Sequence, residues 1–294
     1  MQLQSIDANG VRLAYVEWGA PSADWPTVYF VHATGFHSRV WDYQVEALLA
    51  QLPDLHIVCL DQRGHGRSEK IGTNTWATYG ADQAAFAQAI DLDGAIGVGH
   101  SMGAHGLIQG AQVSGRFDRL LLLDPTVSSP EAYAEGGSWP DGEIHPASKR
   151  RANFQSVEEM KAALAEKSSF PLYHPRIFDD YCRHGLEPAE EGLTLCCKPE
   201  IEAMVYMAAR GHGAIYDYVR ALDIPVTVVR AKLPGADAMM DWSSSPTWPE
   251  LAGQFAQGRD VHWSDCTHFI PMQRPDEVVA MLVEEVNAWR ALRS

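Results

Sequence analysis

A serine in a glycine-flanked turn is the residue of this chain best placed for covalent chemistry. Ser101 is the centre of GHSMG, residues 99–103, which is a G-x-S-x-G pattern. The apolar run 95–98 before it predicts a strand, and the small residues of 102–108 after it predict the start of a helix. At such a turn the hydroxyl is raised above the edge of a sheet, and a helix N-terminus points at it. We therefore predict that Ser101 is a nucleophile.

A nucleophilic serine needs a base, an acid that orients the base, and donors for the oxyanion. His268 is the predicted base because it lies in a loop between a short predicted strand, 260–263, and the C-terminal helix. The order Ser, Asp, His along the chain also suits a serine at this kind of turn. His262 is a nearby alternative, but it lies within the strand pattern.

Three aspartates are candidates for the acid. With a serine at such a turn, the acid usually lies in the turn after a strand near the C-terminal end of the sheet, here 224–230. No carboxylate follows that strand at short range. Asp237 and Asp241 come later in the same loop and could serve if it folds back. Asp124 ends the predicted buried strand 119–124, whose carboxyl end faces the same edge as the serine. We favour Asp124, with Asp241 as the alternative acid and Asp237 third.

Two backbone amides are predicted to form the oxyanion hole. They are the N–H of Met102, at the start of the helix, and that of Thr34, in the loop after the predicted strand 27–32. The glycine-rich loop 61–68 has no P-loop Lys-Ser/Thr pair, so we interpret it as a structural support near the site. We find no metal-ligand spacing and no dinucleotide fingerprint, and we expect neither a metal nor a cofactor.

The elements that must position these residues alternate between strands and helices. Short apolar runs predict strands, and apolar residues at helical spacing predict a helix over 41–52 and another that opens at Pro275. This alternation predicts an α/β fold with a mostly parallel sheet flanked by helices. The predicted strands are 11–18, 27–32, 56–61, 95–98, 119–124, 224–230 and 260–263.

The middle of the chain breaks this alternation. Residues 126–220 contain helical patterns with Pro and Gly interruptions and no buried-strand pattern. Such a segment is too long for a loop in a compact domain. We therefore predict a core formed by 1–125 and 221–294, with 126–220 as a helical cap inserted into it.

Composition limits the partners and the compartment. The 294 residues carry a formal net charge of −15, which disfavours nucleic acid and anionic membranes as partners. Five cysteines without a C-x-x-C pair, and no secretory leader pattern, predict reduced thiols and a cytoplasmic protein. No apolar run approaches the roughly 20 residues of a membrane span. The expected partner is a small-molecule substrate, and a homodimer is one open oligomeric state.

The motifs together resemble the α/β-hydrolase superfamily. They are VHATGF at 31–36, DQRGHGRS at 61–68, GHSMG at 99–103, and His268, so the resemblance spans nearly the whole chain. It implies the α/β-hydrolase fold, with the insertion similar to the helical cap of esterases, epoxide hydrolases and ring-cleavage-product hydrolases. Ala231 stands where a Gly precedes the usual acid. The superfamily also includes members whose acid follows the strand after the nucleophile helix, which favours Asp124.

These features predict a serine hydrolase that cleaves a small carboxylic ester or lactone through an acyl-enzyme on Ser101. Relatives that act on epoxides or haloalkanes carry Asp at the nucleophile position, so Ser101 argues against both activities. The first alternative is a C–C hydrolase of ring-cleavage products, for which cations at Arg150, Arg151, Arg176 or Arg183 could bind a dicarboxylate. The second alternative is a ligand receptor that keeps the same residues and turns over slowly.

Overall fold

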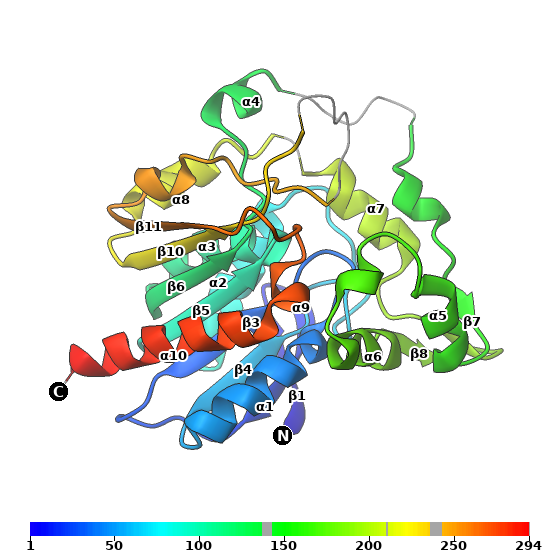
Figure 1. The fold of residues 1–294 in the computed structure, drawn as a ribbon, viewed down its shortest axis with the longest axis horizontal. Helices are drawn as coiled ribbons and strands as arrows, with labels where there is room; N and C mark the ends of the chain where they lie inside the picture. The colour runs from blue at the N-terminus through cyan, green and yellow to red at the C-terminus, as the bar shows by residue number, and fades with distance from the viewer. Residues whose placement is uncertain (137–142, 210, 236–242, 294) are drawn as a thin grey trace.

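An eight-stranded sheet forms the centre of the computed structural model, which describes residues 1–136, 143–209, 211–235 and 243–293 (Figure 1). The strand order is β1-β2-β4-β3-β5-β6-β10-β11, and every pairing from β4 to β11 is parallel. The strands are β1 (Gln2–Ala8), β2 (Val11–Trp18), β3 (Thr27–Val31), β4 (His56–Leu60), β5 (Ala95–His100), β6 (Phe117–Leu123), β10 (Pro225–Arg230) and β11 (Gln257–His262). The structure confirms the predicted α/β fold with a mostly parallel sheet.

Helices cover both faces of this sheet. One face packs against α1 (Asp42–Gln51) and α10 (Pro275–Ala291), which contact each other. The other face packs against α2 (Ala77–Ala89), α3 (Met102–Ser114) and α8 (Ile215–Ala221). Two hydrophobic clusters result, one on each side, because side chains alternate between the faces of a strand.

The burial of the strands follows their place in the sheet. Every residue of β3, β4 and β5 is buried, as expected for parallel strands covered on both faces. The edge strands β1 and β11 are largely exposed. The parallel arrangement brings the carboxyl ends of β3, β5, β6 and β10 to one edge of the sheet, where the predicted site residues lie.

The chain leaves the sheet after β6 and returns at β10. Between them lie α4 (Pro130–Ala134), α5 (Val157–Leu164), α6 (Pro175–His184) and α7 (Pro199–Met207), with α8 packed on α3. Short 3-10 turns occur here at η2 (Pro146–Lys149) and η3 (Phe170–Leu172), and elsewhere at η1 (Ser38–Trp41) and η4 (Leu251–Gln254). Figure 1 shows α5, α6 and α7 grouped on one side of the sheet.

This insertion is not purely helical. It contains a small sheet in the order β7-β9-β8, formed by β7 (Asn153–Phe154), β9 (Leu193–Leu195) and β8 (Leu186–Pro188). Each strand has two or three residues, which is too short to produce the alternating pattern by which a strand is predicted from sequence.

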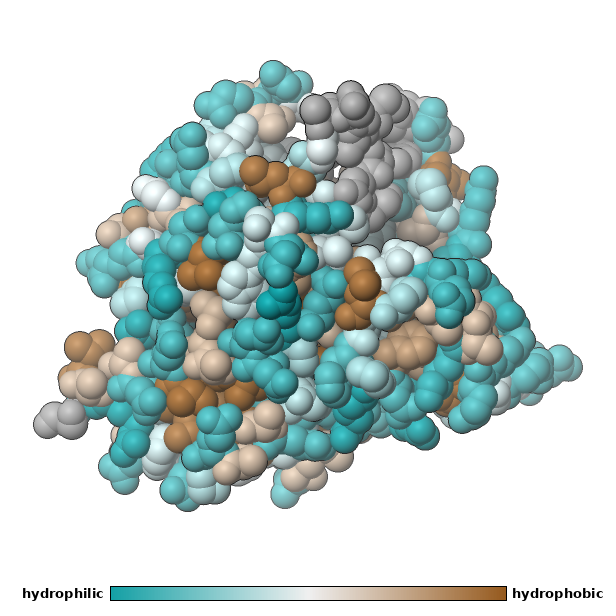
Figure 2. All heavy atoms as spheres, viewed as in Figure 1, coloured by the Kyte–Doolittle hydropathy of each residue, from teal (hydrophilic) through white to brown (hydrophobic). Residues whose placement is uncertain are grey.

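No helix in the described ranges combines the length and the apolar character that crossing a membrane requires. The face of the molecule drawn in Figure 2 is mainly hydrophilic, and its hydrophobic residues form small separate groups.

Candidate active site

Ser101 occupies the turn between β5 and α3 in a backbone conformation that non-glycine residues rarely adopt. Its φ is 57° and its ψ is −121°. Two glycines allow the turn to close. A Cβ on Gly103 would lie 2.4 Å from the carbonyl oxygen of His32, and one on Gly99 would lie 2.5 Å from the Cα of Ala104. The pattern around Ser101 therefore reflects the close approach of α3 to β3 and β5.

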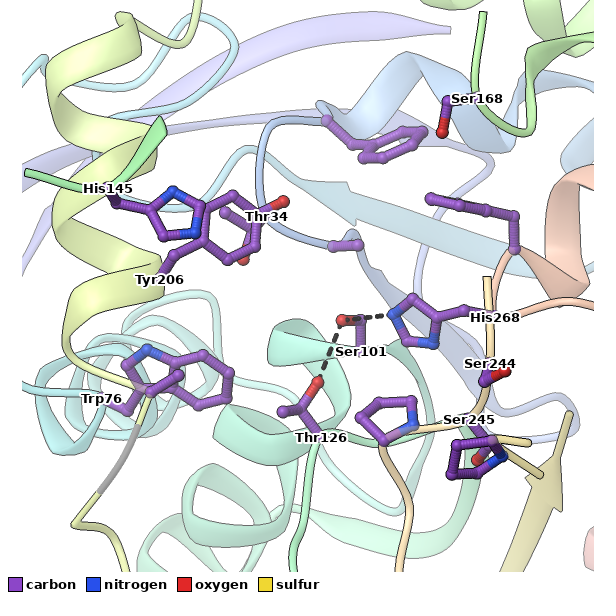
Figure 3. Close-up of a pocket in the computed structure, with 16 residues that line it drawn as sticks. Thr34, Trp76, Ser101, Thr126, His145, Ser168, Tyr206, Ser244, Ser245 and His268 are labelled. Atoms are coloured by element: carbon purple, nitrogen blue, oxygen red, sulfur yellow. Dashed lines mark hydrogen bonds between the residues drawn. The ribbon is translucent and has the colours of Figure 1, made fainter. Parts of the chain in front are cut away.

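Ser101, His268 and Asp124 form a continuous chain of hydrogen bonds. His268 Nε2 lies 2.9 Å from Ser101 Oγ (Figure 3). On the other side of the ring, His268 Nδ1 lies 2.6 Å from Asp124 Oδ2. With Nδ1–H donating to the carboxylate, Nε2 is left to accept the proton of the serine hydroxyl. The three residues come from the ends of β5 and β6 and from the loop before α9 (Ile270–Gln273).

The Asp124 carboxylate is held from both sides of the sheet edge. Besides His268, it accepts hydrogen bonds at Oδ1 from Ala231 N–H at 3.0 Å, Ser245 Oγ at 2.5 Å and Thr247 Oγ1 at 3.1 Å. The side chain is fully buried, so these donors replace the water that would otherwise solvate its charge. The loop after β10 therefore supplies donors to the acid. Asp237 and Asp241 lie outside the described residues.

The backbone around His268 is also fixed. Its N–H donates to the carbonyl of Ser243 at 2.8 Å, and its carbonyl accepts a hydrogen bond from His100 Nε2 at 2.8 Å. His100 is therefore protonated on Nε2 when neutral. Burial lowers the pKa of His100 well below its usual value, which keeps the ring uncharged beside His268.

Of the two predicted oxyanion donors, Thr34 is among the residues that line the cavity, and Met102 directly follows Ser101. Met102 is the first residue of α3, where an amide N–H has no acceptor within the helix. Thr34 lies in the loop after β3 and lines the cavity beside Ser101. The segment that begins at Asp61 supports this region, because the Asp61 carboxylate accepts hydrogen bonds from Ser38 N–H at 2.6 Å and from Arg67 N–H at 2.8 Å.

A cavity of about 460 Å³ opens onto Ser101. The described residues that line it include no Arg, Lys, Asp or Glu. Apolar groups form much of its wall, namely Ala33, Phe36, Trp76, Ala209, Pro234, Pro246 and Phe269. The insertion between β6 and β10 contributes to the same wall through residues such as Ser168 and Tyr206.

Thr126 also contacts the nucleophile, although it was not among the site residues predicted from the sequence. Its Oγ1 lies 3.1 Å from Ser101 Oγ, and its backbone N–H donates to the carbonyl of Ser101 at 3.3 Å. The sequence did offer one indication of this contact: Thr126 comes two residues after Asp124, and a residue so close to the acid must lie near the same edge of the sheet. Figure 3 shows Ser101 between Thr126 and His268.

The four arginines considered for a dicarboxylate are all engaged by carboxylates. Arg150 pairs with Glu202 at 2.9 Å and also donates to the hydroxyl of Tyr181. Arg151 pairs with Glu159, Arg176 with Glu46 and Asp180, and Arg183 with Asp179. None of these arginines lines the cavity at Ser101.

One group of described residues could in principle supply three metal ligands. Asp42, Asp180 and His184 lie between α1 and α6, with one ligand atom of each within 4.8 Å of the others. Arg39 already pairs with Asp42 at 2.5 Å, and Arg176 with Asp180 at 2.8 Å. These cations provide the positive charge that a metal ion would bring, and the group is not part of the cavity wall.

The chain is similar to known proteins along most of its length. A sequence model of the alpha/beta hydrolase family matches residues 28–281. The N-formylmaleamate deformylase of Pseudomonas putida is 31% identical over 271 residues, which cover 86% of this chain and 93% of that protein. A non-heme chloroperoxidase of Streptomyces lividans is 27% identical and covers 79% and 83% of the two chains.

Among solved structures, E-2-(acetamidomethylene)succinate hydrolase superposes with a TM-score of 0.71 at 20% identity. The match covers 96% of this chain and 98% of that one, so the two share the fold along nearly their full length.

Proposed function

Because the chain belongs to the α/β-hydrolase family, we propose that it is a serine hydrolase that cleaves a small, uncharged carboxylic ester or lactone. The observation that carries this proposal is the hydrogen-bonded chain from Ser101 through His268 to Asp124, beside a cavity that no described Arg, Lys, Asp or Glu lines.

In the first step, Ser101 Oγ attacks the carbonyl carbon while its proton moves to His268 Nε2. The 2.9 Å distance between these atoms lies within the range that a proton transfer requires. Asp124 keeps the imidazole in the required tautomer and stabilises the imidazolium that forms.

The negative charge that develops on the carbonyl oxygen needs donors that are already in place. We assign this role to the N–H groups of Met102 and Thr34, with the N-terminus of α3 adding its dipole. His268 then gives its proton to the leaving oxygen, and the acyl group stays on Ser101. In the second step His268 activates a water molecule, which releases the acid and restores the hydroxyl.

Charge separates this proposal from the alternative C–C hydrolase. Two relatives are named for anionic substrates, N-formylmaleamate and 2-(acetamidomethylene)succinate. In this chain no described cation lines the cavity, and Arg150 is already neutralised by Glu202. An unpaired carboxylate in such a cavity would lose its hydration without compensation. An uncharged substrate is therefore favoured.

The test is a substrate panel run beside Ser101→Ala. 4-Nitrophenyl butyrate and 4-nitrophenyl succinate form a matched pair, since they differ by a terminal methyl against a terminal carboxylate. We expect the butyrate ester to give the higher kcat/KM by at least about tenfold. A simple γ-lactone and a vinylogous diketo acid complete the panel.

Ser101→Ala should lower the hydrolysis of every substrate by several powers of ten while the melting temperature stays close to that of the wild type. Retention of more than about a tenth of the activity would remove Ser101 from the mechanism. Rapid turnover of the diketo acid with negligible ester hydrolysis would favour the C–C hydrolase. Very slow turnover of all substrates, with a ligand-dependent rise in melting temperature, would favour the receptor.

A further inference from the structure

The hydroxyl of Thr126 lies beside the nucleophile, and the steps proposed for ester cleavage assign it no role. Thr126 Oγ1 is 3.1 Å from Ser101 Oγ, and it belongs to the cavity wall. Among the described residues it has no other hydrogen-bond partner. A threonine hydroxyl has one donor and two acceptor positions, so contact with Ser101 leaves it able to accept a further hydrogen bond.

Hydrogen bonds hold the backbone of Thr126 on both sides. Thr126 N–H donates to the carbonyl of Ser101, and the carbonyl of Thr126 accepts a hydrogen bond from His105 Nδ1 at 2.9 Å. His105 is buried, and burial lowers its pKa to about 3, so the ring stays neutral. The segment also follows directly from Asp124, which is itself held by four donors. Thr126 Oγ1 is therefore preorganised with respect to Ser101.

Esters and amides make different demands on such a site. The leaving atom of an ester is an oxygen that carries no hydrogen. The leaving nitrogen of a secondary amide carries one, and this nitrogen becomes pyramidal when Ser101 adds to the carbonyl. Its lone pair must turn toward His268 to take the proton, and its N–H then points away from His268. In a cavity with apolar walls that N–H costs free energy unless an acceptor meets it.

We propose that Thr126 Oγ1 accepts this N–H, and that the site therefore cleaves small uncharged secondary amides as well as esters. Thr126 and His268 contact different sides of Ser101 (Figure 3), which matches the opposite directions of the N–H and the lone pair. The hydroxyl can donate to Ser101 Oγ and accept from the nitrogen at the same time.

Amide cleavage would use the same Ser101, His268 and Asp124 as ester cleavage, so this inference rests on the proposed function. Ser101 Oγ forms a bond to the carbonyl carbon, and its proton moves to His268 Nε2. The C–N bond then breaks as this proton passes to the nitrogen, and the amine leaves. Water deprotonated by His268 releases the carboxylic acid and restores Ser101.

The experiment compares one ester and one amide with the same acyl group and the same chromophore. The substrates are 4-nitrophenyl butyrate and N-(4-nitrophenyl)butanamide, assayed with the wild type, Thr126→Val and Thr126→Ser. Valine keeps the branched shape of threonine and removes its hydroxyl, and serine keeps the hydroxyl. Thermal unfolding of each variant verifies that it is folded.

We expect the wild type to cleave both substrates. Thr126→Val should lower kcat/KM for the amide by at least about tenfold more than for the ester, and Thr126→Ser should keep the wild-type ratio within about threefold. If the wild type cleaves the ester but not the amide, the inference is wrong while the proposed function stands. If Thr126→Val lowers both rates equally, Thr126 only positions Ser101, and the inference is again wrong. If neither substrate is cleaved, the proposed function fails as well.

Discussion

The carboxylate of Asp124 and the imidazole of His268 meet in a 2.6 Å hydrogen bond although 144 positions separate them in the sequence. Asp124 follows β6, the neighbour of the strand that carries Ser101, and its own φ is 47°. The strand beyond it, β10, is followed by Ala231, whose N–H donates to the Asp124 carboxylate. The end of β10 thus binds the acid through its backbone and does not need to supply a carboxylate itself.

Replacing Asp124 by Asn should remove most of the activity. The side-chain amide of Asn can donate an N–H to Nδ1, which favours the wrong tautomer of His268. The rate should therefore fall about 10⁴-fold, with little change in substrate binding. Steady-state kinetics on a 4-nitrophenyl ester measures this. Asp118→Asn is the control, because Asp118 lies near the start of β6 and pairs with Arg293; it should keep nearly full activity. Equal losses in the two variants would contradict the role given to Asp124.

The hydroxyl of Ser245 should matter only through Asp124. Ser245 Oγ lies 2.5 Å from Asp124 Oδ1, and a hydrogen bond to a carboxylate contributes about 1.5–3 kcal/mol. We expect Ser245→Ala to lower kcat by about tenfold in the wild type and to have almost no effect in Asp124→Asn. The reason is that the effects of substituting two residues in contact do not add. Independent, additive effects in this double-mutant cycle would show that Ser245 acts elsewhere.

Buried histidines should make the fold sensitive to acid. Burial lowers the pKa of His32 to about 4, and that of His65 and His105 to about 3. Their unfolded pKa lies near 6.5, so below that pH the unfolded chain binds more protons than the folded chain. The free energy of unfolding should therefore fall as the pH decreases from about 6.5, by up to about 1.4 kcal/mol per pH unit for each histidine.

Denaturant titrations at pH 7.5, 6 and 5 test this expectation. A single variant, His105→Gln, should reduce the slope of the free energy against pH, whereas His262→Gln at the end of the exposed strand β11 should leave it unchanged. A free energy of unfolding that is constant between pH 7.5 and 5 would contradict the expectation.

Adding one methyl group at Gly103 should disturb both the fold and the site. The new Cβ would lie 2.4 Å from the carbonyl oxygen of His32, so α3 would have to move away from β3. We expect Gly103→Ala to lower the melting temperature by several degrees and to reduce activity more than a loss of stability alone explains. Gly253→Ala is the control, because no atom lies within 4 Å of its added Cβ. Similar behaviour of the two variants would show that the turn can relax.

Much of the core could be predicted from sequence because its parallel strands are continuous apolar runs. The strand β1 was not predicted, since it is an exposed edge strand with few apolar residues. The helix α2 was also not predicted, because its many alanines give little difference in hydrophobicity between its buried and exposed faces. The short strands of the insertion lie below the length at which periodicity can be recognised.

The site divides in the same way. Ser101 and His268 were identified by a local motif and by chain order, which need no knowledge of distance. The choice among Asp124, Asp237 and Asp241 depended on how the loop after β10 folds, and that is a tertiary property. Hydroxyls such as those of Thr126 and Ser245 are frequent in any sequence, so only the structure brings them next to the nucleophile and the acid.

The distance of 167 positions between Ser101 and His268 has a consequence for synthesis of the chain. Chain synthesis proceeds at about 5–20 residues per second, so the ribosome adds His268 roughly 10–30 s after Ser101. During that interval β3, β4, β5 and β6 can already pair, and Ser101 and Asp124 can take their places. The nascent chain then carries a hydroxyl of ordinary reactivity, and the hydrolytic activity arises only when the final segment of the sheet edge is added.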